Sequence, residues 1–202
     1  MGNTDRPMGF IPHGELLRER LYCIETVPTI NVCIGDAVIA SGDHILTPKK
    51  GYLQSIRDSA IPDGVAGLLG AVVSVFDENM KPTRYIAPSA AGNSTIAGYV
   101  MVADHPDQEF ICQEDADGNA IDTNEGSMNV DVQSDTLCAP QSVTGLSTQE
   151  LDSTTAGNAA ALQVKIIRPH EDDTPGDDSD VGCRYIVQFN EHYYGDTMGG
   201  IA

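Results

Sequence analysis

The sequence has no tryptophan, only 5% aromatic residues and few basic residues. Its 11 lysines and arginines face 30 aspartates and glutamates, so the formal net charge is -19. A domain that binds free nucleic acid needs clustered lysine and arginine, and an anionic membrane surface attracts the same residues. The composition therefore predicts neither direct nucleic-acid binding nor membrane binding.

Long apolar runs are missing as well. The longest apolar stretch, residues 65–76, is interrupted by Gly67, Gly70 and Ser74, and a membrane-spanning helix needs about 18 apolar residues or more. The first ten residues, MGNTDRPMGF, do not place a basic region before an apolar one. We therefore expect neither a membrane span nor a secretory signal.

The cysteines show no pairing pattern. Cys23, Cys33, Cys112, Cys138 and Cys183 are odd in number and widely spaced, with no CxxC motif. This spacing favours buried, reduced thiols over a disulfide framework or a zinc site. A chain of this kind is expected to be made and assembled in a reducing cytoplasm.

Signatures of catalysis are also lacking. The sequence has no GxSxG, GxGxxG, GxxxxGK[ST] or HExxH motif, and none of its five histidines has a metal-ligand spacing. Residues 115–119 (DADGN) resemble the start of an EF-hand loop, but Gly118 stands at the fourth place and Glu125 falls one place short. We interpret this segment as an Asp-Gly turn, and we expect no enzyme, no cofactor and no metal site.

Turn-forming residues are abundant, with 20 glycines and 11 prolines between short apolar segments. This pattern predicts an all-β chain, a small β-barrel or sandwich body over residues 19–195 with long acidic loops at 114–128 and 171–180. Residues 133–160 are expected to be mostly loop, residues 196–202 a flexible C-terminal tail, and residues 52–58 either helix or strand. The other expected strands are residues 22–25, 29–34 paired with 37–40, 44–47, 68–76, 83–86, 98–103, 109–113, 129–132, 162–168 and 184–189.

Residues 1–18 are predicted to form an extended arm, because Pro7 and Pro12 prevent a continuous helix. Residues 1–60 carry a net charge of only -1, whereas residues 61–202 carry -18. The arm also contains several apolar residues, among them Phe10 and Ile11. A segment of this size cannot bury itself, so it packs either on its own domain, on a sister subunit or on another protein.

Several segments resemble, in order along the chain, the head decoration (cement) proteins of tailed bacteriophages. The opening pattern D-[KR]-P-x-G-[FL]-x-P matches residues 5–12, and a Gly-Asp-x-Val turn matches residues 35–38. Further similar segments are residues 69–73, 84–89, 99–107 with Phe110 and 113–115, 150–156, and 189–195.

The resemblance implies a structural virion protein on the outer capsid surface, where it would join neighbouring major capsid subunits and stabilise the head against internal DNA pressure. It implies a homo-oligomer, with a trimer favoured over a dimer, and the major capsid protein as partner. The arm residues expected to bind the capsid are Arg6, Pro7, Phe10, Ile11 and Pro12. Two alternatives stay open: another phage β-barrel protein of the tail tube, neck or spike, and a cytoplasmic β protein that binds Ca²⁺ or a small molecule.

Overall fold

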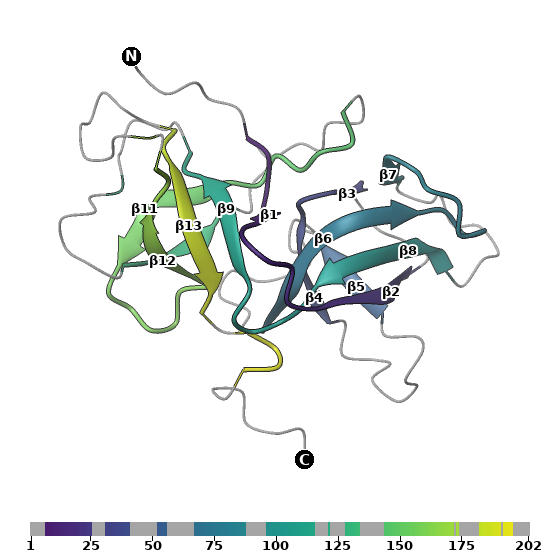
Figure 1. Ribbon diagram of the computed structural model, residues 1–202, viewed down its shortest axis with the longest axis horizontal. Coiled ribbons are helices and arrows are strands. Elements are labelled where there is room, and N and C mark those ends of the chain that lie inside the picture. Colours follow the sequence, from purple (N-terminus) through teal and green to yellow (C-terminus); the bar gives the residue numbers. More distant parts are fainter. Residues whose placement is uncertain are drawn as a thin grey trace.

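A computed structural model describes residues 7–25, 31–40, 52–55, 67–87, 96–115, 121, 128–133, 144–171, 173, 182–190 and 192–195. These residues form thirteen β-strands and no helix (Figure 1), so the all-β prediction is confirmed. The strands are β1 (Ile11–Pro12), β2 (Glu19–Glu25), β3 (Val32–Cys33), β4 (Ala37–Ala40), β5 (Tyr52–Ser55), β6 (Leu68–Phe76), β7 (Tyr85–Ile86), β8 (Ile96–Ala103), β9 (Glu109–Gln113), β10 (Asn129–Val132), β11 (Leu151–Gly157), β12 (Val164–Pro169) and β13 (Arg184–Phe189).

Five of the strands pair in a closed ring, in the order β2-β5-β4-β6-β8, with β8 pairing back to β2. The β2–β5 pair is parallel, and the other four pairs are antiparallel. Strands of this ring share a core cluster with the two-stranded β3–β7 pair, which contributes Val32 and Ile86. The ring contributes Tyr22, Ile24, Val38, Leu69, Val72, Val75, Val100 and Val102. The ring is therefore filled by side chains and holds its own small core.

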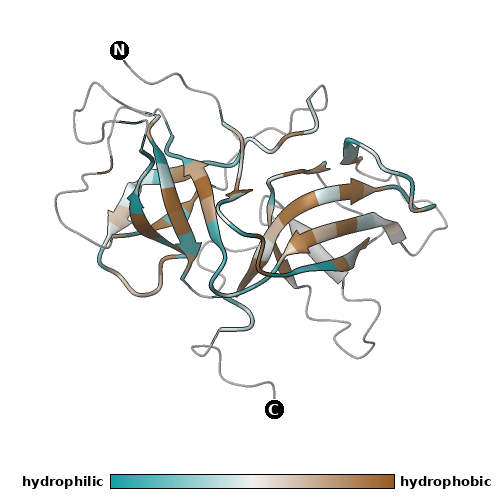
Figure 2. Cartoon of the chain, viewed as in Figure 1, coloured by the Kyte–Doolittle hydropathy of each residue, from teal (hydrophilic) through white to brown (hydrophobic). Residues whose placement is uncertain are grey.

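The second unit is a six-stranded antiparallel sheet in the order β1-β9-β13-β12-β10-β11. Figure 1 shows this sheet on one side of the molecule, the ring on the other, and β1 between them. In Figure 2 apolar colour follows the strands of both units. A larger core joins the units, because it contains Phe110 and Tyr185 of the sheet together with Ala37 and Leu68 of the ring.

Strand β6 lies between the two cores, which explains the longest apolar stretch of the sequence. Leu69 and Val72 face the interior of the ring, whereas Leu68 and Ala71 face the core shared with the sheet. Successive side chains of a strand point to opposite faces, and the register of β6 against β4 shifts between Leu68 and Gly70, so apolar residues of β6 reach both cores.

Most of the expected strands are present, but two expectations about the chain path are wrong. The segment before the Gly35–Asp36 turn does not pair with β4, because β3 pairs with β7 instead. The Asp36 carboxylate accepts a hydrogen bond from the Cys33 backbone N–H at 2.8 Å, which closes a local turn rather than a hairpin. Residues 151–157, expected to be loop, form β11, which is anchored by the fully buried Leu151 and paired with β10.

Cys23, Cys33, Cys112 and Cys183 are buried, as the sequence predicted, and no disulfide joins any two of these four described cysteines. Cys138 and Arg6 lie outside the described residues, as do the expected strand at 44–47 and the tail at 196–202. Most of the two acidic loops also falls outside them.

Candidate functional site: the anchored N-terminal segment

The N-terminal segment from residue 7 to residue 18 packs against its own chain. Phe10 has no exposed surface, and its ring lies 5.1 Å from the ring of Phe189 and 6.3 Å from that of Phe110, measured between centroids. Ile11 and Pro12 form β1, which pairs with β9 at the edge of the six-stranded sheet. Phe10 therefore belongs to the core that joins the two units.

Two glycines, Gly9 and Gly35, allow the N-terminal segment to pass close to the turn at residues 35–36. Gly9 has a φ of 68° and Gly35 a φ of 90°, in the left-handed region that favours glycine. A Cβ atom at Gly9 would lie 2.4 Å from the carbonyl oxygen of Gly35 and from Cβ of Ser147. The Phe10 N–H donates to the same Gly35 carbonyl oxygen at 2.8 Å, which fixes the position where Phe10 enters the core.

Gln108 holds the next part of the segment. Its side chain is almost fully buried, and its Oε1 accepts a hydrogen bond from the Leu17 backbone N–H at 2.9 Å. Its Nε2 donates to the carbonyl oxygens of His13 and Glu109. Residues 13–17 are thus fixed by one amide that reaches them from the β8–β9 connection.

A buried carboxylate fixes the end of the segment. Asp104 has no exposed surface, and its Oδ1 lies 2.7 Å from Nε of Arg18. The Tyr22 hydroxyl donates to Asp104 Oδ2 at 2.5 Å, and Nε of Arg20 lies 3.6 Å from the same oxygen. The guanidinium groups of Arg18 and Arg20 lie 5.2 and 5.3 Å from the centroid of the Tyr194 ring, in reach of a cation–π interaction. A buried carboxylate is tolerated when it is paired and hydrogen-bonded in this way.

Burial shifts the pKa values of two residues in and beside this cluster. Burial raises the pKa of Tyr22 far above its usual value, and the hydrogen bond to Asp104 raises it further. Burial lowers the pKa of His192 to about 4, so this imidazole is neutral at pH 7. Its Nδ1 accepts a hydrogen bond from the Tyr194 backbone N–H at 3.0 Å, which is consistent with a neutral ring.

The segment presents apolar side chains to solvent although it is fixed in place. Among the described residues, eight large apolar side chains are exposed, and four of them lie between Ile11 and Leu21. We call these four, Ile11, Leu16, Leu17 and Leu21, the apolar edge; each is 40–48% exposed. Residues 7–21 carry two acids and two bases, so the apolar edge lies in a neutral segment of a strongly acidic chain.

The residues expected to bind a partner therefore have different environments. Phe10 is a core residue of this chain, because its ring is enclosed by the aromatic side chains of β9 and β13. Pro7 and Pro12 are half-buried, and Ile11 is 41% exposed. Of the placements that the sequence left open for the arm, the structure shows residues 7–18 packed on their own chain.

The acidic residues of the EF-hand-like segment and of the second acidic loop have structural partners where they are described. Asp115 Oδ1 accepts from the Ser153 backbone N–H at 3.2 Å, and its Oδ2 accepts from Nε2 of Gln133 at 3.3 Å. Asp173 forms two side-chain hydrogen bonds with Arg184, at 2.9 and 3.0 Å, and these outweigh the effect of burial and lower the pKa of Asp173. In the described part of the chain, no three His, Cys, Asp or Glu side chains are grouped to hold a metal ion, and no helix is long and apolar enough to cross a membrane.

Two parts of this site are not apparent from the sequence. Leu21 directly precedes an expected strand and gives no sign of its exposure, and the roles of Gln108 and Asp104 have no local signal of their own.

Comparison with protein-family models, curated proteins and solved structures finds no match to this chain. The similarity to phage decoration proteins rests on the sequence segments alone.

Proposed function

We propose that this protein is a structural virion protein that binds the outside of a tailed-phage capsid through the apolar edge. The observation that carries the proposal is the apolar edge itself, which concentrates half of the exposed large apolar side chains of the described residues within Ile11 to Leu21. Exposed apolar patches with polar surroundings are typical of protein–protein contacts.

The way in which the segment is held supports a binding role. A disordered arm loses conformational entropy when it binds, and this loss weakens the complex. Phe10, Gln108 and Asp104 already fix residues 10–18 against the body, so little further ordering would be needed. In this proposal Phe10 orients the segment, and Ile11, Leu16, Leu17 and Leu21 contact the partner.

Charge gives the proposed orientation. Residues 61–202 carry a net charge of -18, and a surface of that charge repels its own kind and keeps particles apart. The neutral N-terminal segment would face the major capsid protein, and the acidic remainder would face outward. The resemblance to decoration proteins favours a trimer over a dimer, and closed symmetry would place such a trimer at threefold positions of the shell.

The test is to add the purified full-length chain to undecorated heads and to measure occupancy by cryo-electron microscopy. Leu17→Asp should abolish decoration, because it places a charge at the most exposed of the four residues of the apolar edge. Ile167→Asp is the matched control, since Ile167 is 39% exposed but lies on β12, and it should decorate normally. Full occupancy by the Leu17→Asp variant would refute the role of the apolar edge, and a position within the tail would refute the capsid role.

A further inference from the structure

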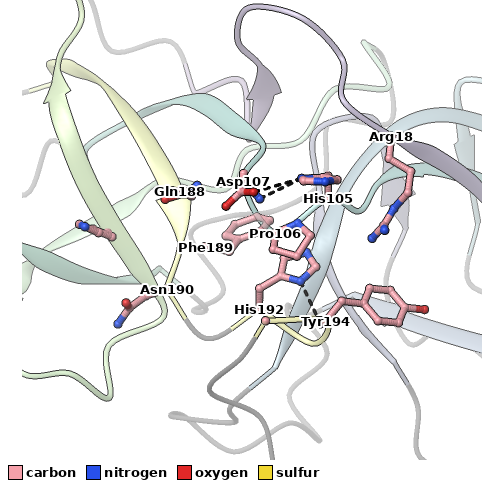
Figure 3. Close-up of a pocket in the computed structure, with 11 residues that line it drawn as sticks. Arg18, His105, Pro106, Asp107, Gln188, Phe189, Asn190, His192 and Tyr194 are labelled. Carbon is pink, nitrogen blue, oxygen red and sulfur yellow. Dashed lines mark hydrogen bonds and ion pairs between the residues drawn. The ribbon is translucent and has the colours of Figure 1, made fainter.

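A groove lies where the ring, the six-stranded sheet and the C-terminal segment meet. Its volume is about 530 Å³, in the range of small-molecule sites. Five stretches of chain line it: Arg18, residues 105–107, Lys165, residues 188–190, and the C-terminal residues His192, Tyr194 and Gly195. Figure 3 shows Gln188 and Asn190 on one side of the groove, with His105, Arg18 and Tyr194 on the other.

The charge of the groove differs from that of the protein. Arg18 and Lys165 line it together with one carboxylate, Asp107, whose side chain is 79% exposed. Asp104 is shared by Arg18 and Arg20, so its single negative charge offsets only one of these two guanidinium charges. Lys165 has no ion-pair or hydrogen-bond partner for its ammonium group among the described residues, so it is available to one anionic group of a ligand.

Neutral hydrogen-bonding groups lie beside this cation. The Gln188 amide has no partner among the described residues and offers both a donor and an acceptor. The Asn190 Nδ2 donates to the carbonyl oxygens of Ala160 and Leu162 at 2.9 and 3.0 Å, which fixes the amide and leaves its Oδ1 as an acceptor. The His105 Nδ1 accepts from the Asp107 backbone N–H at 3.1 Å, so its Nε2 is the nitrogen left for a ligand.

Flat apolar surfaces complete the lining. Tyr194 as a residue is 43% exposed, and Pro106 lies beside His105. Because Arg18 and Arg20 lie over the Tyr194 ring, Pro106 and the part of Tyr194 that these arginines leave uncovered provide the apolar surface. Aromatic and proline rings pack well against the C–H face of a sugar, while amide groups pair with its hydroxyls. Arg18 is already engaged by Asp104, so Lys165 is the cation of the lining that has no partner among the described residues, and one such ammonium group suits the single charge of a carboxylate better than the nearly double charge of a phosphate.

We propose that this groove binds a carbohydrate that carries a carboxylate group, with Lys165 on the carboxylate and Gln188 and Asn190 on the hydroxyls. The proposal is independent of the capsid role, because the groove residues other than Arg18 lie outside the N-terminal segment.

The probes are a hexuronic acid disaccharide, the neutral hexose disaccharide of the same linkage, and inorganic phosphate. Binding to the full-length chain is measured by saturation-transfer NMR and titration calorimetry. The uronic acid should bind about fivefold more tightly than the neutral sugar, as expected for one partly exposed charge pair. Lys165→Gln should abolish that preference, and Gln188→Ala should weaken the binding of both sugars.

Lys81→Gln is the matched control, because Lys81 is exposed in the connection after β6 and lies outside the groove lining; it should change nothing. Circular dichroism confirms that each variant is folded. Equal binding of the two sugars would refute the role of the carboxylate, and displacement of the uronic acid by an equal concentration of phosphate would show a simple anion site instead. Absence of binding by both sugars would overturn the proposal.

Discussion

Replacing Phe10 with alanine tests whether the N-terminal segment is part of the core. The side chain has no exposed surface and packs against Phe110 and Phe189, and removal of a fully buried phenylalanine costs about 3–5 kcal/mol. Domains are stable by only about 5–15 kcal/mol, so the loss is a large fraction of the total. For a chain of this length it corresponds to a fall in melting temperature of roughly 6–20 °C.

The measurement is urea unfolding followed by far-UV circular dichroism, with Ile11→Ala as the control. Ile11 is the next residue along the chain but is 41% exposed, so its truncation should cost less than about 1 kcal/mol. If the two variants unfold at the same urea concentration, the segment does not pack as described. The same reasoning bears on deletion of residues 1–18, which a free arm would tolerate but which here also removes Phe10 from the core.

Four further substitutions test other contacts of the segment and the buried His192. Asp104→Asn leaves Arg18 and Tyr22 without their carboxylate and should lower the free energy of unfolding by about 2–4 kcal/mol in urea titrations; an unchanged midpoint would contradict the importance of this buried pair. Gly9→Ala should cost about 3 kcal/mol, because its Cβ would lie 2.4 Å from the Gly35 carbonyl oxygen and φ is positive. Gly14→Ala, with φ of 72° and nothing within 4 Å of the added atom, should cost only about 1 kcal/mol. Equal losses of stability in the two variants would argue against the close contact between Gly9 and Gly35. Because the pKa of His192 is lowered to about 4 in the folded state, the unfolded chain binds the extra proton between about pH 6.5 and 4. The stabilisation from the neutral His192 is complete above pH 6.5. The free energy of unfolding falls by up to about 3 kcal/mol as the pH falls toward 4. His192→Gln should flatten this part of the plot of unfolding free energy against pH, even though Asp104, Arg18 and His105 remain nearby. An unchanged slope would mean that the pH dependence comes from other groups.

The strands with a strong local pattern were predictable. Residues 68–76 and 184–189 are rich in β-branched and aromatic residues and bounded by turns, and they form β6 and β13 as expected. β11 was not predictable, because residues 151–157 are mostly serine, threonine and small residues with Leu151 as their one fully buried side chain. Its strand conformation depends on pairing with β10, which is a tertiary contact.

The candidate site was predictable only in part. The sequence identified an apolar, nearly neutral N-terminal segment and named Phe10 and Ile11 within it. It could not separate their roles, because burial in the chain's own core and burial against a partner remove the same apolar surface from water. No local pattern in the sequence predicted the groove, because its lining comes from residues spread between Arg18 and Gly195.

Composition and periodicity by themselves determined the all-β class, the buried thiols and the neutral N-terminal segment in an acidic chain, because these properties depend on residue type and on local alternation along the chain. Only the tertiary structure decided that five strands close into a ring, that Phe10 lies in the core between the ring and the sheet, and that Lys165 and Gln188 line one groove. Those features depend on contacts between residues distant in sequence, and such contacts form only where complementary surfaces meet in the folded chain.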